Sequence, residues 1–92
     1  MFMFYQKVYV RVVCEFLLSG GVRPLKLYWS DGKSYSIDRV KFIETAPCLS
    51  GGVLPQRYTV IISGQQRYLY YEIKNQRWFV EIKVSIVFLQ ID

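Results

Sequence analysis

Residues 57–83, RYTVIISGQQRYLYYEIKNQRWFVEIK, decide the fold of this chain. Apolar side chains recur at every second position through three segments of this stretch, and the polar residues around Gly64 and Asn75 separate the segments. A period of two is typical of a β-strand that buries one face. The stretch therefore predicts a meander of three antiparallel strands joined by two tight turns.

The two turns set the register of this meander. We expect Gly64-Gln65 to form a type II′ turn and Asn75-Gln76 to form the second turn. The pairs that these loops set opposite each other all lie on one apolar face: Val60 with Leu69, Tyr58 with Tyr71, Ile73 with Trp78, Tyr71 with Val80, and Leu69 with Ile82. On the other face, Arg57 lies opposite Glu72, which is a favourable cross-strand pair.

The second face of the meander combines aromatic and basic side chains, and it is the candidate binding face: Arg57, Arg67, Tyr68, Tyr70, Phe79 and Lys83. Aromatic rings between cations suit single-stranded nucleic acid, because bases stack on the rings and phosphates meet the cations. Tyr, Phe and Arg are also enriched in protein interfaces. A third possibility is a second small core beneath a loop or the N-terminal strand. Glu72 and Glu81 weigh against nucleic acid, since they place negative charge within the face.

The segment from Val84 to Leu89 is apolar on both parities. A strand of this kind should be covered on both faces. We therefore expect a homodimer, with these contact residues: Val84, Ile86, Val87, Phe88 and Leu89. The alternative is a strand wedged under the long first strand of its own chain.

The first half of the chain shows the same period of two. Residues 4–16 predict one long strand, with Val8 to Phe16 alternating on its apolar face. A hairpin follows, in which a three-residue loop from Ser30 to Gly32 keeps Leu27 opposite Tyr35 and gives Gly32 the left-handed position. Tyr9, Arg11, Lys26 and Tyr28 form a second basic and aromatic group on the outward parity.

Two irregularities follow this hairpin. The alternation slips at Asp38-Arg39, which predicts a β-bulge that helps to curve the sheet. Residues 46–55 contain two prolines and two glycines, so they predict a loop.

Composition agrees with an all-β chain. The sequence has 92 residues, 52% of them hydrophobic, with eight Tyr, six Phe and two Trp, and such residues favour strands. We expect a single domain over 1–92: a small antiparallel barrel of about six strands, SH3-like or related, with the C-terminal meander. The runner-up is a two-layer open sheet completed by dimerisation.

The sequence lacks the residues that several kinds of catalysis and ligand binding require. The chain has no histidine, which is the most common general base and metal ligand. Cys14 and Cys48 alone cannot complete a zinc site, and no glycine-rich phosphate loop is present. Glu72 and Glu81 are diagonal neighbours in the expected register, but each has a structural partner. We predict no enzyme activity, no cofactor, no metal and no small-molecule substrate.

The net charge of +5 favours contact with polyanions such as nucleic acid. The first residues, MFMFYQK, do not resemble an export signal. No apolar stretch approaches the roughly 20 residues that span a bilayer. The expectation is a cytoplasmic protein with reduced cysteines that is not embedded in a membrane.

Two stretches, RPLKLYWSDGKSYSIDRV and QRYTVIISGQQRYLYYEIKNQRWFVEI, resemble an uncharacterised family of small bacterial β-domains. The pattern comprises Pro24, Trp29, Gly32, Tyr35, Ile37, Asp38, Arg57, Tyr58, Trp78, Phe79, Val80 and Glu81. The resemblance covers roughly two thirds of the chain and implies a small barrel but no activity. The residues themselves favour a non-enzymatic interaction domain that self-associates, with a nucleic-acid-binding module as the alternative.

Overall fold

The part of the chain that the structure describes folds as one antiparallel sheet of seven strands. The computed structural model describes residues 2–52 and 54–86, and this part contains no helix. The strands are β1 (Phe2–Phe16), β2 (Val22–Tyr28), β3 (Ser34–Ser36), β4 (Arg39–Thr45), β5 (Gln56–Ile62), β6 (Gln65–Glu72) and β7 (Arg77–Ile86). The all-β class is confirmed, and the expected number of about six strands is one too few.

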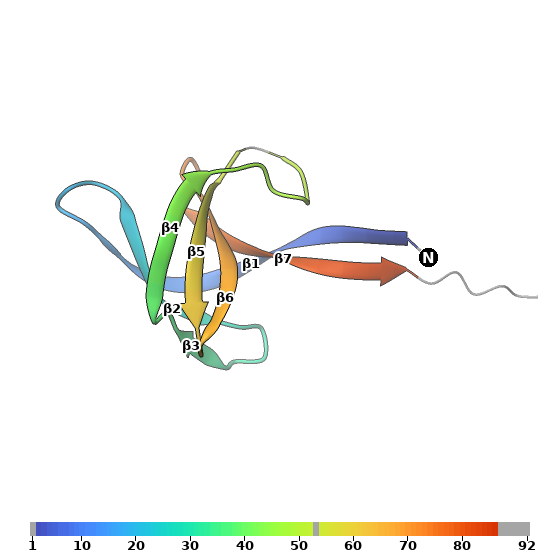
Figure 1. Cartoon of the computed structure of the whole chain (residues 1–92), viewed down its shortest axis with the longest axis horizontal. Coiled ribbons are helices and arrows are strands. Elements are labelled where there is room, and N and C mark those ends of the chain that lie inside the picture. The colour runs from blue at the N-terminus through green and yellow to red at the C-terminus, as the bar shows by residue number, and fades with distance from the viewer. Residues whose placement is uncertain (1, 53, 87–92) are drawn as a thin grey trace, which may run out of the picture.

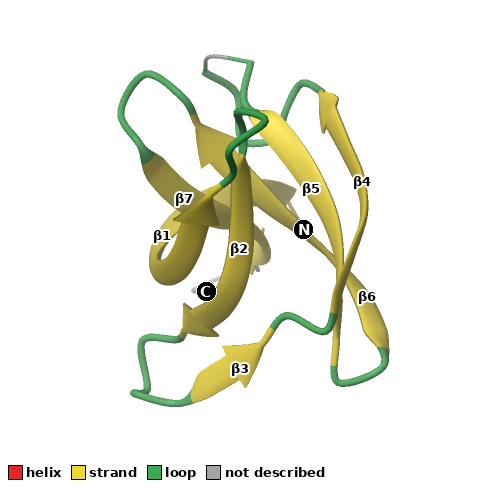
Figure 2. Cartoon of the chain, turned by 90° about the vertical axis from the view of Figure 1, so that its left-hand side faces the viewer, coloured by secondary structure: helices red, strands yellow, loops and turns green. Residues whose placement is uncertain are grey.

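The sheet curls because its two edge strands are neighbours in the chain. The strand order is β3-β2-β1-β7-β6-β5-β4, so β3 and β4 lie at opposite edges. Only Ile37-Asp38 connects them, and this link bonds to both sides: Ile37 donates its N–H to the Leu25 carbonyl and Asp38 donates to the Ile61 carbonyl, both at 2.9 Å. The sheet therefore bends into a half-barrel (Figure 2).

This link also explains the slip in the sequence pattern. The alternation breaks at Asp38 because the chain changes its partner strand there, from β2 to β5. The expected bulge at Asp38-Arg39 is thus wrong in position. The irregularity in the pairing of β4 with β5 falls between Val40 and Phe42.

The N-terminal half of β1 and the C-terminal half of β7 form a two-stranded ribbon. Their pairing runs from Phe2 opposite Ile86 to Val10 opposite Trp78. Beyond the half-barrel this ribbon projects away from the other strands (Figure 1). The end of β7 therefore pairs beside the first strand, instead of being wedged beneath it.

The hairpin of β2 and β3 has the expected register. Leu27 lies opposite Tyr35, and the Trp29 N–H donates to the Lys33 carbonyl at 2.8 Å. The loop therefore has three residues, and Gly32 adopts a φ of 86°. The conformation predicted for Gly32 is confirmed.

Both turns of the C-terminal meander differ from the expected ones. Ile62 pairs with Gln65, so the first loop is Ser63-Gly64, and both of these residues have positive φ (51° and 76°). Positive φ at both central positions is the mark of a type I′ turn. The second loop has four residues, because Glu72 pairs with Arg77.

These shifts move each pairing by two positions and change its partners. Tyr58 faces Leu69, and Tyr71 faces Trp78. Arg57 lies opposite Tyr70, not Glu72.

The predicted inner face of the meander survives these shifts except at Ile73, because a shift of two positions preserves parity. Ile73 lies in the second loop and is 61% exposed, so its expected pairing with Trp78 is wrong. Tyr58, Val60, Leu69, Tyr71 and Trp78 are all buried in the main core, together with Val22 of β2. The Tyr58 ring packs edge-on against Trp78 at 5.0 Å, and its hydroxyl donates to the Val22 carbonyl at 2.7 Å. This bond ties β5 to β2 across the inside of the curl.

Candidate binding cleft between two separating strands

Tyr70 and Phe79, two members of the candidate binding face, are buried. Their exposed fractions are 4% and 0%, and the two rings stack with centroids 5.0 Å apart and planes at 7°. The expectation that both side chains are exposed is wrong. The meander is covered on both faces, which corresponds to the second small core left open by the sequence.

The second small core, formed around Tyr70 and Phe79, is called the outer core. Side chains of β1 lie against it, and so does the loop between β4 and β5. Tyr9 packs edge-on against Phe79 at 5.7 Å, and the Lys7 Nζ lies 5.0 Å from the centre of the same ring. From the loop, the Ser50 N–H donates to the Glu81 carboxylate. The cover therefore comes from outside the meander, from the N-terminal strand and from the loop that leads into β5.

Glu81 is held as a carboxylate by this loop. Burial opposes its charge, but hydrogen bonds from Tyr70 and from the backbones of Ser50 and Leu49 outweigh burial and lower the pKa of Glu81. Burial, together with the bond to Glu81, raises the pKa of Tyr70 to about 12. At neutral pH the Tyr70 hydroxyl is therefore neutral, and it donates a hydrogen bond to the charged Glu81 carboxylate.

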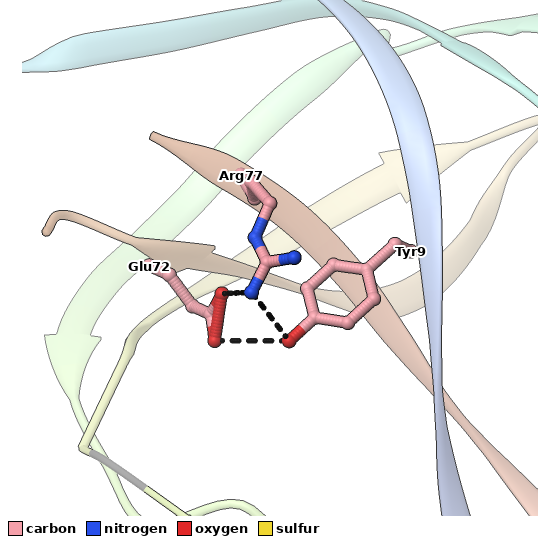
Figure 3. A network of polar contacts seen from close by, with 3 residues as sticks. All are labelled: Tyr9, Glu72 and Arg77. Atoms are coloured by element: carbon pink, nitrogen blue, oxygen red, sulfur yellow. Dashed lines mark hydrogen bonds and ion pairs between the residues drawn. The ribbon is translucent and has the colours of Figure 1, made fainter. Parts of the chain in front are cut away.

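Glu72 is more deeply buried than Glu81, and it has partners on two strands (Figure 3). The Tyr9 hydroxyl donates to Glu72 Oε2 at 3.1 Å. Arg77 Nη2 lies 3.2 Å from Glu72 Oε1 and donates to the Tyr9 oxygen at 3.3 Å. The network joins β1, β6 and β7. Both glutamates thus have structural partners.

The remaining members of the candidate face surround the outer core. Arg67, Tyr68 and Lys83 are exposed, whereas Arg57 is half-buried. The Arg57 guanidinium lies 4.6 Å from the centre of the Tyr68 ring and pairs with Glu44 at 2.6 Å. The structure thus leaves Arg67, Tyr68 and Lys83 accessible, with Arg57 partly so.

β6 and β7 separate immediately beyond the stacked pair. Within the described residues they pair at only three positions, from Glu72 opposite Arg77 to Tyr70 opposite Phe79. From there β7 continues along β1, while β6 continues along β5. The expected pair of Leu69 and Ile82 is wrong for two reasons: the register differs by two positions, which sets Leu69 level with Val80, and the strands part before that level.

A cleft with a volume of about 830 Å³ opens where the strands part. Its lining comes from both faces of the sheet. From the inner face come Leu27, Trp29, Val60, Ile62, Leu69, Val80 and Ile82, and from the outer face come Tyr5, Leu49, Arg57, Tyr68, Tyr70 and Glu81. A cleft that reaches both faces is a gap in the sheet itself, and its walls are mostly apolar.

The backbone edges along this gap have no strand partner among the described residues. Side-to-side alternation in an antiparallel ladder, counted from the pair of Ile62 and Gln65 that closes the β5–β6 hairpin, turns the N–H and C=O groups of Gln66 and Tyr68 toward the gap. The same count on β7 turns those of Glu81 and Lys83 toward it. The gap thus has hydrogen-bonding edges on two sides.

Two of the expected dimer contacts, Val84 and Ile86, lie on β7 within the ribbon. Val84 is half-buried and pairs with Phe4, and Ile86 pairs with Phe2. Val87, Phe88 and Leu89 lie outside the described residues.

Of the second basic and aromatic group, Arg11 and Lys26 both lie over Tyr28, at 4.8 and 5.6 Å from the ring centre.

Sequence reasoning missed the cleft and two of its lining residues, Tyr5 and Leu49. One signal was available. β7, with ten residues, is longer than β6, with eight, and the alternation continued past Lys83 into a segment that is apolar on both faces. The extra length pairs with β1, which has 15 residues.

Three comparisons with known proteins found no match: no family model, no curated protein and no solved structure is similar to this chain. The resemblance to a family of bacterial β-domains therefore stays a prediction.

Both cysteines are free and half-buried. In the part of the chain that the structure describes, no helix has the length and hydrophobicity needed to cross a bilayer.

Proposed function

We propose that this chain is a non-enzymatic interaction domain that self-associates in the cytoplasm. One observation carries the proposal: β6 and β7 part beyond Tyr70 and Phe79, and an apolar cleft opens between unpaired strand edges. Open edges are sites at which another strand can pair. Large apolar clefts on small soluble domains are commonly interaction sites.

The projecting ribbon supports the same proposal. Phe4 is 44% exposed there although it lies within a regular strand. An exposed two-stranded ribbon is marginally stable by itself, so contact with another chain would stabilise it. The half-barrel, with its edges joined by the bent segment at Ile37-Asp38, also supports a small barrel related to the SH3 fold.

Sedimentation velocity of the full chain across a range of concentrations tests self-association. We expect a dimer for the unmodified chain and a monomer for Phe88→Glu, because a charge at this position of the apolar segment opposes burial. Phe42→Glu is the matched control. Phe42 is 60% exposed on the edge strand β4, and this variant should remain dimeric. A monomer at every concentration for the unmodified chain would overturn the proposal.

Nucleic-acid binding is the second candidate, and one observation favours it. The Arg11 guanidinium and the Lys26 ammonium both lie over the Tyr28 ring on the outer face, so two cations and an aromatic ring lie close together there. The burial of Tyr70 and Phe79 removes two of the rings that the sequence had assigned to stacking. A base stacked on Tyr28 would therefore have to replace part of these cation contacts.

Titration of a labelled single-stranded oligonucleotide at low and high salt tests this candidate. Binding through phosphates should weaken steeply as salt rises, and Tyr28→Ala should weaken it further at constant charge. Tyr35→Ala, at a partly exposed tyrosine on edge strand β3, serves as the control. Absence of binding at low salt would eliminate the candidate.

A further inference from the structure

We propose that the cleft between β6 and β7 receives residues Val87–Leu89 of a second copy as an added β-strand, in a reciprocal exchange between two chains. This inference rests on the proposed self-association and names the segment that binds and the place where it binds.

The shape of the cleft fits a strand. It opens in the plane of the sheet, between two strands that pair normally at Tyr70 and Phe79 and separate beyond them. Its walls carry inner-face residues such as Leu69 and Ile82 and outer-face residues such as Tyr5 and Tyr68. Side chains of a strand alternate between the two faces, so a strand in this gap would contact both sets.

The backbone supplies the second part of the fit. The N–H and C=O groups of Glu81 and Lys83 on β7 and of Gln66 and Tyr68 on β6 point into the gap, by the alternation described above. In an inserted strand, the N–H and C=O groups of alternate residues point to opposite sides. The groups on one side would bond to β7, and those on the other side would face β6. Addition of a strand at an open sheet edge is a common mode of recognition.

The occupant should be largely apolar on both faces, because apolar side chains predominate in the walls, although the outer-face wall also carries Arg57 and Glu81. The segment from Val84 to Leu89 has this property, with Phe88 on one parity and Val87 and Leu89 on the other. It is also electrically neutral, so it would bring no unpaired charge into the gap.

The segment of the same chain cannot occupy this place. Val87 follows Ile86, which pairs with Phe2 at the far end of the ribbon (Figure 1). A tight turn back toward the cleft uses at least two residues. A chain that turned back directly after Ile86 would therefore come level with Lys83 only with residues beyond Leu89. A second chain is needed to bring this segment to the cleft.

A two-fold axis beside Ser85 satisfies these conditions. Antiparallel pairing of β7 with the partner's β7 about this axis sets Lys83 opposite the partner's Val87 and Glu81 opposite the partner's Leu89. The partner's Phe88 then falls beside Ile82 and points to the inner face, because paired residues share a face. The same contacts recur in the other chain, which closes the dimer.

Amide hydrogen exchange of the full chain, followed by NMR, reads the occupancy of both edges. In the dimer, the amides of Tyr68, Glu81 and Lys83 should exchange at least tenfold more slowly than in the monomeric Phe88→Glu variant. On β6 only the Tyr68 amide is used, because Phe88 is the one residue of Val87–Leu89 whose carbonyl faces β6 in this register. The amide of Ser36 is the control, because alternation from the bond between Ile37 and Leu25 turns it away from β2 at the sheet edge.

A disulfide assay in a Cys14→Ala, Cys48→Ser background tests the register. One chain carries Lys83→Cys and the other carries Val87→Cys. Oxidation of the mixture should cross-link the two chains, because residues opposite each other in a ladder lie within disulfide reach. A mixture of Lys74→Cys with Val87→Cys is the control and should not cross-link.

The outcomes separate the two proposals. Slow exchange at these amides together with the cross-link supports the inserted strand. A dimer in which the amides of Tyr68, Glu81 and Lys83 exchange as fast as in the monomer overturns the insertion but leaves self-association standing. A monomeric unmodified chain overturns both proposals.

Discussion

The stacked rings of Tyr70 and Phe79 mark the last position at which β6 and β7 pair. Their centroids lie 5.0 Å apart, and beyond them the strands diverge around the cleft. The pair therefore closes the meander on one side and forms one end of the gap on the other. This position makes the outer core part of the framework that shapes the cleft.

Phe79→Ala should destabilise the fold by about 3–5 kcal/mol, the usual cost of removing a buried Phe side chain. Phe79 is fully buried and contacts both Tyr70 and Tyr9. Tyr68→Ala is the control, since Tyr68 is 47% exposed on the same face, and it should cost under about 1 kcal/mol. Urea unfolding followed by circular dichroism measures both. Equal, small losses would contradict the burial of the outer core.

Stability should fall as the pH rises from about 10 to about 12. The pKa of Tyr70 is raised by burial and by its bond to Glu81 to about 12, from an ordinary value near 10. Its contribution is therefore complete below the unfolded pKa and is lost as the pH rises through the folded pKa. Tyr70→Phe should flatten this alkaline decline.

The measurement is urea unfolding at a series of alkaline pH values. Burial also raises the pKa values of Tyr58 and Tyr71, so some decline should remain in Tyr70→Phe. An unchanged pH profile in that variant would contradict the assignment of the shift to Tyr70.

The sequence pattern predicted which meander residues point inward, but it could not predict their partners. Moving a turn by one residue changes the register by two positions, and with a period of two this leaves every side chain on the same face. The choice between Ser63-Gly64 and Gly64-Gln65 therefore depended on turn conformation alone. Serine seldom adopts positive φ, so its place in the turn was not evident.

The outer core could not be predicted from the meander itself. Tyr9 of β1 and Ser50 of the loop before β5 cover it, and the alternation of a strand does not reveal what lies above its polar face. The hairpin at Gly32 was predictable, because only the three-residue loop kept Leu27 opposite Tyr35. At that hairpin, a two-residue loop would have set core-facing residues opposite solvent-facing ones. In the meander, both candidate positions of the turn keep the two faces apart, so the faces could not decide between them.

Ser63→Asn should stabilise the chain by about 0.5 kcal/mol, because Asn-Gly is the preferred type I′ sequence and Asn tolerates positive φ better than Ser. Gly64→Ala should destabilise it by about 1–2 kcal/mol. A Cβ at Gly64 would meet no atom within 4 Å, so this loss would report backbone strain alone. Thermal unfolding of both variants measures the effects, and a neutral Gly64→Ala would contradict the positive φ of this turn.

Arg77→Met should destabilise the fold by about 1–3 kcal/mol, because it leaves the buried Glu72 carboxylate with the Tyr9 hydroxyl as its one described side-chain partner. The Arg77 side chain is 52% exposed, which keeps the expected loss below that of a fully buried ion pair. In a Glu72→Gln background the same substitution should cost less, because no buried charge remains to be compensated. Urea unfolding of the four proteins in this double-mutant cycle gives the coupling, and strictly additive losses would show that the two side chains do not interact.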